Sequence, residues 1–244
     1  MADHPSRIAI LPARGGSKRI KDKNIRPFCG RPIIHYPLAA AKESGLFDLI
    51  HVSTESPRIR EVVVGLGFPV DFLRAPELAD DQTPIAPVLR WVLERYAAQG
   101  RKFDDVFLIM PCAPLIEAED LRQGYQAYLR HGRERPLLAV SPFPVPIEWA
   151  FEKDKSGGLK PCQPGMAMVR SQDLGRKYYD TGAFAVFNAS SLLHAAPTDE
   201  DYVSYLLPKS KAVDIDDPED LELAETLYLG RLARRRAPEE IRNP

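Results

Sequence analysis

The sequence predicts an α/β fold in which a mostly parallel sheet is flanked by helices. Strand-like and helix-like patterns alternate from the first residues onward, which is typical of βαβ units. A chain of 244 residues suffices for one domain with a large core. Its hydrophobic and charged fractions, 44% and 27%, are ordinary for a water-soluble globular protein. We therefore expect a single domain over residues 1–244.

The first half of the chain contains four apolar runs that are expected to be strands, at 8–11, 48–53, 70–73 and 106–110. Helical patterns lie between or after them, at 33–44, 57–66 and 85–98. Gly45 is a stop signal for the first helix, and Pro37 inside that helix implies a kink or a late start. Loops are expected at 74–83 and at the proline-rich turn 111–114.

The second half begins with a helix at 117–128 and a strand at 137–140. Residues 141–177 then form an excursion, rich in proline and glycine and poor in helical periodicity. We expect loops and hairpins there, with a separate role as a substrate lid or a dimer contact. Strands at 181–187 and 211–215 and a helix at 218–232 should follow. Asp217 before Pro218, with Asp220 three residues on, predicts the N-cap of that helix.

Charge and cysteine content narrow the class of protein. A formal net charge of −1 argues against general nucleic-acid binding. Cys29, Cys112 and Cys162 are widely spaced and form no metal or redox motif, which favours a reducing cytosol. The N-terminus lacks the apolar region of a signal peptide, and no apolar stretch is long enough to span a bilayer. We expect a cytoplasmic protein without a membrane partner.

A basic, glycine-containing loop at 11–24 is the most informative segment. Gly15 and Gly16 could adopt positive φ and let the backbone approach a ligand closely. Backbone N–H groups in such a loop can converge on an anion, and nearby cations supply the opposite charge. The cations of this loop are Arg14, Lys18, Arg19, Lys21 and Lys23. The alternative is a solvated face or a weak nucleic-acid patch. The position directly after a buried strand favours a triphosphate site.

Two aspartates near the C-terminus, Asp214 and Asp216, form a second candidate site. In an extended segment they share one face, because side chains alternate along a strand. Two carboxylates on one face suit Mg²⁺, which binds one or two carboxylates together with substrate phosphates. Helix capping by the same aspartates is the alternative. Both roles can coexist if Asp217 caps the helix.

Four motifs in order resemble the cytidylyltransferases that make CMP-activated nonulosonic, or sialic-type, acids. They are PARGGSKRI at 12–20 followed by Lys23 and Asn24, VST at 52–54, LRAPELADD at 73–81 and DID at 214–216. Within the family the chain is most similar to the pseudaminic acid cytidylyltransferases. That similarity rests on FPVPI at 143–147, RSQDL at 170–174 and YDTGAF at 179–184.

The resemblance implies a Rossmann-like, GT-A-type nucleotidyltransferase fold, a Mg²⁺ requirement and a homodimer formed through the excursion. It implies CTP and a nine-carbon 2-keto sugar acid as substrates, with Arg14, Lys23 and Asp216 as catalytic residues. The nucleotide-binding residues would be Leu11, Ala13, Arg14, Gly15, Ser17, Lys23, Asn24, Ser53, Arg74 and Asp80. The acceptor-binding residues would be Arg170, Gln172, Asp180 and Thr181, and the metal ligands Asp214 and Asp216.

The sequence thus predicts an enzyme that joins CMP from CTP to a nonulosonic acid, with pseudaminic acid as the first choice, for cell-surface or flagellar glycan synthesis. N-acetylneuraminic and legionaminic acid are the alternative acceptors. A non-catalytic nucleotide-binding protein on the same fold is the alternative from another class. A dinucleotide-dependent oxidoreductase is disfavoured, because the first loop lacks the Gly-x-Gly-x-x-Gly spacing.

Overall fold

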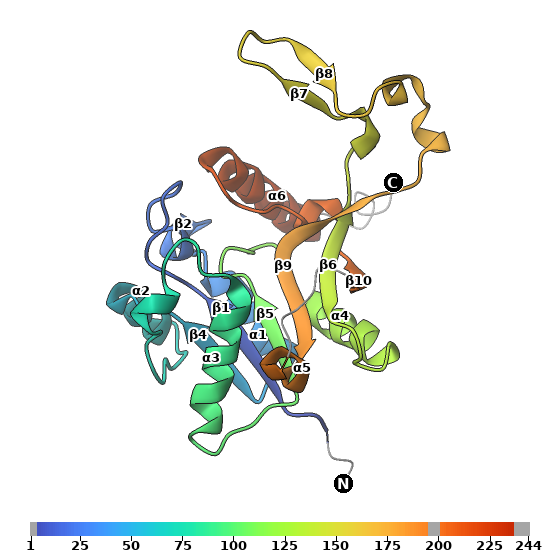
Figure 1. Cartoon of the computed structure of the whole chain (residues 1–244). Coiled ribbons are helices and arrows are strands. Elements are labelled where there is room, and N and C mark those ends of the chain that lie inside the picture. Colours follow the sequence, from blue (N-terminus) through green and yellow to red (C-terminus); the bar gives the residue numbers. More distant parts are fainter. Residues whose placement is uncertain (1–3, 195–200, 237–244) are drawn as a thin grey trace.

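The computed structural model describes residues 4–194 and 201–236. Its centre is a six-stranded sheet with the strand order β10-β6-β9-β5-β1-β4 (Figure 1). The strands are β1 (Arg7–Pro12), β4 (Leu49–Ser53), β5 (Asp105–Ile109), β6 (Leu137–Pro142), β9 (Tyr178–Asn188) and β10 (Val203–Leu206). β1 runs parallel to β4 and β5, and β10 runs parallel to β6. Only β9 is antiparallel to its neighbours in this sheet, so the predicted mostly parallel α/β sheet is confirmed.

Helices cover both faces of the sheet. They are α1 (His35–Ser44), α2 (Pro57–Gly65), α3 (Ile85–Ala97), α4 (Ala118–Arg130), α5 (Ala189–His194) and α6 (Pro218–Arg236). On β1, Ile8 and Ile10 pack against α3 and α5, while Ala9 and Leu11 pack against α1, α2 and α4. A strand buried on both faces reads as a continuous apolar run, which is why residues 8–11 were recognisable. Each fully buried Ile or Leu side chain contributes about 2 kcal/mol of stability.

The last helix packs against the N-terminal part of the chain. In α6, Ala224 is fully buried and packs, with Ile215 ahead of the helix, against Ile20 and Phe28. Helix α6 begins as predicted. The Asp217 carboxylate accepts hydrogen bonds from the backbone N–H of Asp220 (3.0 Å) and of Glu219, and Asp220 accepts one from the Asp217 N–H at 3.0 Å. This packing holds residues 214–216 close to the basic loop.

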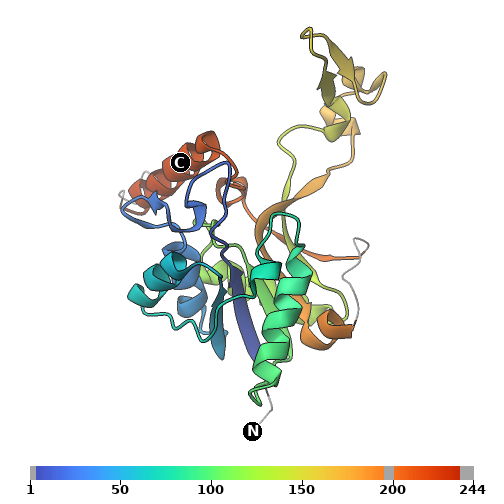
Figure 2. The ribbon, with the colours of Figure 1, turned by 60° about the vertical axis from the view of Figure 1, so that its left-hand side comes forward.

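The excursion forms an arm, residues 143–177, between β6 and β9. It contains the hairpin of β7 (Phe151–Lys153) and β8 (Leu159–Pro161) and 3₁₀ turns at Ile147–Trp149, Met166–Met168 and Ser171–Asp173. Figures 1 and 2 show the arm projecting away from the sheet and its helices. The predicted loops and hairpins are confirmed, although residues 141 and 142 still belong to β6.

Two predicted strands were wrong. Residues 70–73 are not a strand: Phe72 packs on the His51 ring of β4, and the backbone hydrogen bond between the two segments, from the Arg74 N–H to the Thr54 carbonyl at 2.8 Å, lies beyond the end of each. Residues 211–215 are not a strand either, and the apolar side chains of Val213 and Ile215 pack beneath α6 instead of pairing with a strand. Strand β10 and helix α5 were not predicted. Within the described part of the chain, no helix is both long and apolar enough to cross a bilayer.

Candidate active site

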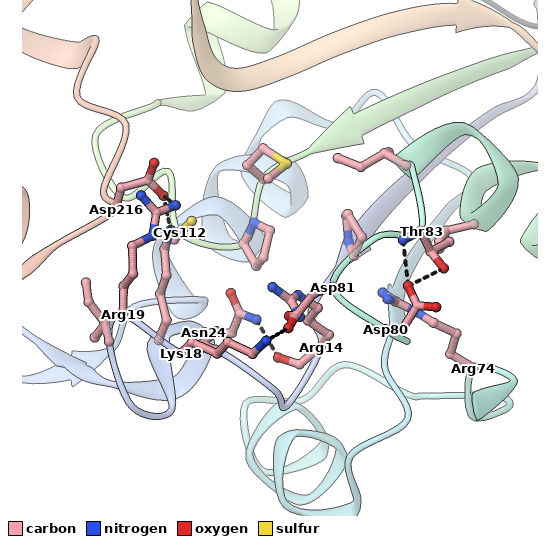
Figure 3. A pocket seen from close by; sticks show the side chains of 18 of the residues that line it. Arg14, Lys18, Arg19, Asn24, Arg74, Asp80, Asp81, Thr83, Cys112 and Asp216 are labelled. Carbon is pink, nitrogen blue, oxygen red and sulfur yellow. Dashed lines mark hydrogen bonds and ion pairs between the residues drawn. The ribbon is translucent and has the colours of Figure 1, made fainter. Parts of the chain in front are cut away.

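A cavity of about 240 Å³ lies beyond the carboxyl end of β1. After β1 the chain forms β4 on one side of it and later β5 on the other, and open α/β sheets bind ligands at such a switch point. The cavity lining comes from the basic loop, from residues 74–88, from residues 110–112 and from Asp216. Seven predicted site residues line it: Arg14, Ser17, Lys23, Asn24, Arg74, Asp80 and Asp216. Figure 3 shows how several of these side chains surround the cavity.

The glycines of the basic loop do not adopt the positive φ that the sequence suggested. Neither Gly15 nor Gly16 has positive φ. Gly15 instead permits close packing, because a Cβ there would lie 3.1 Å from the Cβ of Ser56. Its backbone N–H donates to the carboxylate of Glu55 at 2.6 Å, so this N–H is already bound within the protein. The loop therefore presents cationic side chains to the cavity, and Gly15 faces away from it. Asn24, almost fully buried, closes the loop by donating to the Arg14 carbonyl at 2.8 Å.

Four of the five loop cations are paired with two carboxylates. Arg14 and Lys18 both bind Asp81, and Figure 3 shows them converging on it. These hydrogen bonds, from Lys18 and then Arg14, lower the pKa of the Asp81 carboxyl. Arg19 and Lys23 bind one oxygen of Asp216, at 2.8 and 3.1 Å.

Asp216 and Lys23 form the less exposed of these pairs. Burial opposes ionisation of Asp216, but Lys23 and Arg19 outweigh it and lower the pKa of this carboxyl. The side chain of Lys23 is only 17% exposed, so its ammonium is held more firmly than the other loop cations. The pair joins the N-terminal loop to the C-terminal aspartates across the cavity, as the two sequence motifs suggested.

Ser53 holds the Arg74 side chain in place with two hydrogen bonds. Arg74 is 5% exposed, and it donates to the Ser53 hydroxyl at 3.0 Å and to the Ser53 carbonyl at 2.6 Å. Burial lowers its pKa, and Glu55 opposes that shift. Ser53 does not line the cavity, so its contribution passes through Arg74. Leu11 and Ala13 are fully buried in the core and do not line the cavity either.

Asp80 shapes the turn that precedes α3. One of its oxygens accepts from the N–H groups of Gln82 and Thr83, at 2.9 and 2.6 Å, and from the Thr83 hydroxyl at 2.7 Å. These bonds, above all those from Thr83, lower the pKa of the Asp80 carboxyl. Asp80 is thus a fixed negative group on the cavity rim, and it orients its neighbour Asp81.

Asp214 and Asp216 lie on either side of the fully buried Ile215. Only Asp216 lines the cavity. Asp214 lies against Gly182, where an added Cβ would lie 3.0 Å from the carboxylate carbon. Gly182 has a φ of +58° and sits in a bulge of β9, where the pairing with β6 is irregular. Burial raises the pKa of Asp214, and the charges of Asp216 and Asp180 add to the effect.

This donor set suits a hard divalent cation. Two neighbouring carboxylates repel each other when no cation lies between them, and the raised pKa of Asp214 reflects its burial and then that repulsion. No group of three or more His, Cys, Asp or Glu side chains that could hold a metal occurs in the residues described. A metal held by Asp214 and Asp216 would therefore need further ligands from water or from a bound anion.

The predicted acceptor residues are dispersed. Gln172 lines a second cavity, of about 510 Å³, at the base of the arm, whereas Arg170 is exposed and lines neither cavity. Thr181 is buried and donates to the Ala139 carbonyl at 2.7 Å. Asp180 lies near enough to raise the pKa of Asp214.

Some residues around these cavities were missed. The second cavity is also lined by the cations Arg176, Lys177 and Lys209. Arg176 and Lys177 stand at the C-terminal end of the excursion, and Lys209 lies outside it. Asp81 lies in the motif at 73–81, but nothing in the sequence connects it with Arg14.

Comparison with known proteins agrees with this geometry. The profile of the family described as cytidylyltransferase matches residues 8–195. A pseudaminic acid cytidylyltransferase of Campylobacter jejuni is 33% identical over 91% of this chain and 95% of its own. A CMP-N,N'-diacetyllegionaminic acid synthase of Legionella pneumophila is 28% identical over 90% of this chain and 95% of its own. A solved CMP:2-keto-3-deoxy-manno-octonic acid synthetase in complex with CTP superposes with a TM-score of 0.66 at 15% identity. It covers 93% of this chain and 99% of its own, and it shares the fold.

Proposed function

The chain belongs to the cytidylyltransferase family, and on that premise we propose that it joins CMP from CTP to a nonulosonic acid and releases pyrophosphate. The observation that carries this proposal is the cavity in which the basic loop meets Asp216. Pseudaminic acid is the acceptor we propose first, because the 33% identical relative carries that name and matches along nearly its whole length. Legionaminic and N-acetylneuraminic acid, which belong to the same chemical class, are the competing acceptors.

The reaction would be an in-line substitution at the α-phosphorus of CTP. The anomeric oxygen of the 2-keto sugar acid forms the new P–O bond, its proton is lost to the medium, and the bond to the β-phosphate oxygen breaks. Phosphoryl transfer of this kind depends mainly on positioning and on neutralising charge. Arg14 and Lys23 line the cavity and would bind the phosphates and the departing pyrophosphate. Arg74, held by two hydrogen bonds to Ser53, would bind the nucleoside.

We propose Mg²⁺ as the cofactor, held by Asp214 and Asp216. When bound, it would supply Lewis-acid stabilisation of the phosphate oxygens. The burial and the repulsion that raise the pKa of Asp214 support a cation at this position. Lys23 and Arg19 keep Asp216 ionised, and Gly182 leaves room for the Asp214 carboxylate.

The arm supports a homodimer. Its exposed apolar side chains include Val145, Ile147, Phe151, Leu159 and Met168, and Met168 is 90% exposed. Exposed apolar groups gathered on a projecting element are typical of an interaction surface. Sedimentation velocity tests this: the wild type should sediment as a dimer, and Leu159→Lys should shift it to a monomer. A monomeric wild type at micromolar concentration would contradict a dimer.

We also propose that residues 1–244 act as one domain in a reducing cytoplasm. All three cysteines fall within the described residues and are free thiols, which suits that compartment.

A pyrophosphate-release assay tests the function. CTP and magnesium are supplied with pseudaminic, legionaminic or N-acetylneuraminic acid in turn, and turnover with pseudaminic acid should be fastest. Activity confined to N-acetylneuraminic acid would overturn the acceptor assignment. CTP binding without turnover on any of the three acids would favour a non-catalytic nucleotide-binding protein.

A further inference from the structure

The Asp81 carboxylate already binds two of the cationic groups that line the proposed phosphate site. Its carboxylate binds both Arg14 and Lys18, and all three residues line the cavity at the end of β1. A carboxylate held between an arginine and a lysine makes the same charge-assisted hydrogen bonds as a phosphate oxygen. The position of Asp81 is therefore that of an anion already bound within the protein (Figure 3).

The turn around Asp81 is built to hold it there. Its neighbour Asp80 accepts three hydrogen bonds, from Gln82 and from the backbone and hydroxyl of Thr83, at 2.6 to 2.9 Å. A turn closed by an aspartate in this way has a defined backbone path. Asp80 faces its own turn, so the adjacent Asp81 is left to reach Arg14 and Lys18.

The other loop cations that line the cavity are also bound to a carboxylate. The Gly15 N–H is bound to Glu55, and Arg19 and Lys23 are bound to Asp216. Phosphates that bind these cations therefore compete with a carboxylate. Asp81 is the easier one to displace because of its partners: Arg14 and Lys18 are 35% and 80% exposed, whereas Asp216 is held in part by Lys23, which is only 17% exposed.

We propose that Asp81 is a positioning residue that competes with the triphosphate: it holds Arg14 and Lys18 in place before CTP binds, yields them to the phosphates, and returns to them as pyrophosphate departs. This inference rests on the proposed function for the identity of the phosphate ligand. Its physical content is a competition of two anions for one pair of cations. The competition weakens triphosphate binding somewhat and favours release of the product. The exchange breaks no covalent bond.

The first experiment is calorimetric titration of inorganic tripolyphosphate, with magnesium present, into the wild type and Asp81→Asn. Exposed ion pairs are individually weak, so removing two of them should tighten tripolyphosphate binding about fivefold. Asp81→Glu keeps the charge and should bind like the wild type. Asp81→Ser, a second neutral variant, should repeat the tightening.

The matched control is Asp22→Asn. Asp22 belongs to the same loop and pairs with Arg58, and neither residue lines the cavity. This variant makes the same change in net charge, so its tripolyphosphate affinity should stay at the wild-type value. In a Lys18→Gln background, the gain from Asp81→Asn should shrink, because one of the two competing contacts has gone.

In turnover, Asp81→Asn should make pyrophosphate a stronger product inhibitor by a similar factor and should lower KM for CTP without raising kcat. A merely structural role would weaken both ligands. Tripolyphosphate binding that is unchanged or weaker in Asp81→Asn overturns the proposal, as does an equal gain in Asp22→Asn. Titration requires no acceptor acid and no chemistry, so failure of the proposed function leaves this result interpretable, and the reverse also holds.

Discussion

Replacing Gly182 by alanine should damage the proposed metal site through one contact. The new Cβ would lie 3.0 Å from the carbon and 3.1 Å from each oxygen of the Asp214 carboxylate. Contacts this short force the carboxylate to move. Gly182 also has a φ of +58°, where an L-residue costs about 1 kcal/mol.

Two separate effects follow from this geometry. The backbone strain should lower the midpoint of thermal unfolding by about 2–4 °C for a chain of this size. Displacing a metal ligand should raise the magnesium concentration for half-maximal activity at least about tenfold, as disturbed metal ligation does elsewhere. The assay is pyrophosphate release as a function of magnesium concentration, together with thermal unfolding of the same samples.

Gly45→Ala separates the two effects. Gly45 has a φ of +66° at the end of α1, and nothing lies within 4 Å of a Cβ built there. It should show the loss of stability without a change in magnesium dependence. If Gly182→Ala matches Gly45→Ala in both measurements, the position of Asp214 does not matter and the reasoning is refuted.

Three further predictions concern the same site. Lys23→Ala should lower turnover about a hundredfold, or about 3 kcal/mol, as loss of one preorganised cationic donor does. Lys21→Ala, at the exposed part of the loop, should turn over at a rate near that of the wild type. Near-normal turnover of Lys23→Ala would refute the role of Lys23. Ser53→Ala leaves the buried Arg74 Nε without its acceptor, so urea unfolding should show a loss of about 1–3 kcal/mol and KM for CTP should rise; unchanged values for both would contradict this. Asp214→Asn should raise the melting temperature at pH 7 without magnesium, because a carboxyl whose pKa is raised in the folded state makes the protein less stable as pH rises. The gain should vanish near pH 4, where the carboxyl of the wild type is protonated in the folded protein. A gain that persists at pH 4 would contradict the burial argument.

The parts of the fold that depend on local pattern were predictable. The apolar run in β1 and the Asp217 cap of α6 each carry their own signal within a few residues. The two wrong strands show where this fails. Residues 70–73 and 211–215 carry the apolar side chains of a strand, but a strand also needs a partner edge, which depends on tertiary packing.

In the site, too, local motifs were predictable and contacts between distant segments were not. The motifs predicted that the basic loop and Asp216 meet, and the structure brings them together at 3.1 Å. The pairing of Arg14 with Asp81 joins positions 67 residues apart, and no local pattern announces it. The use of Gly15 to pack against Ser56, and of Gly182 to make room for Asp214, likewise follows only from which segments the fold brings together.

The most direct measurement of the central claim is the identity of the product. Wild-type protein with CTP, magnesium and pseudaminic acid should yield pyrophosphate and a compound whose mass and ³¹P spectrum correspond to one CMP joined to the sugar acid through a phosphodiester. Lys23→Ala should form the same compound far more slowly. Recovery of unchanged CTP from the wild type, under conditions in which it binds the nucleotide, would contradict the account.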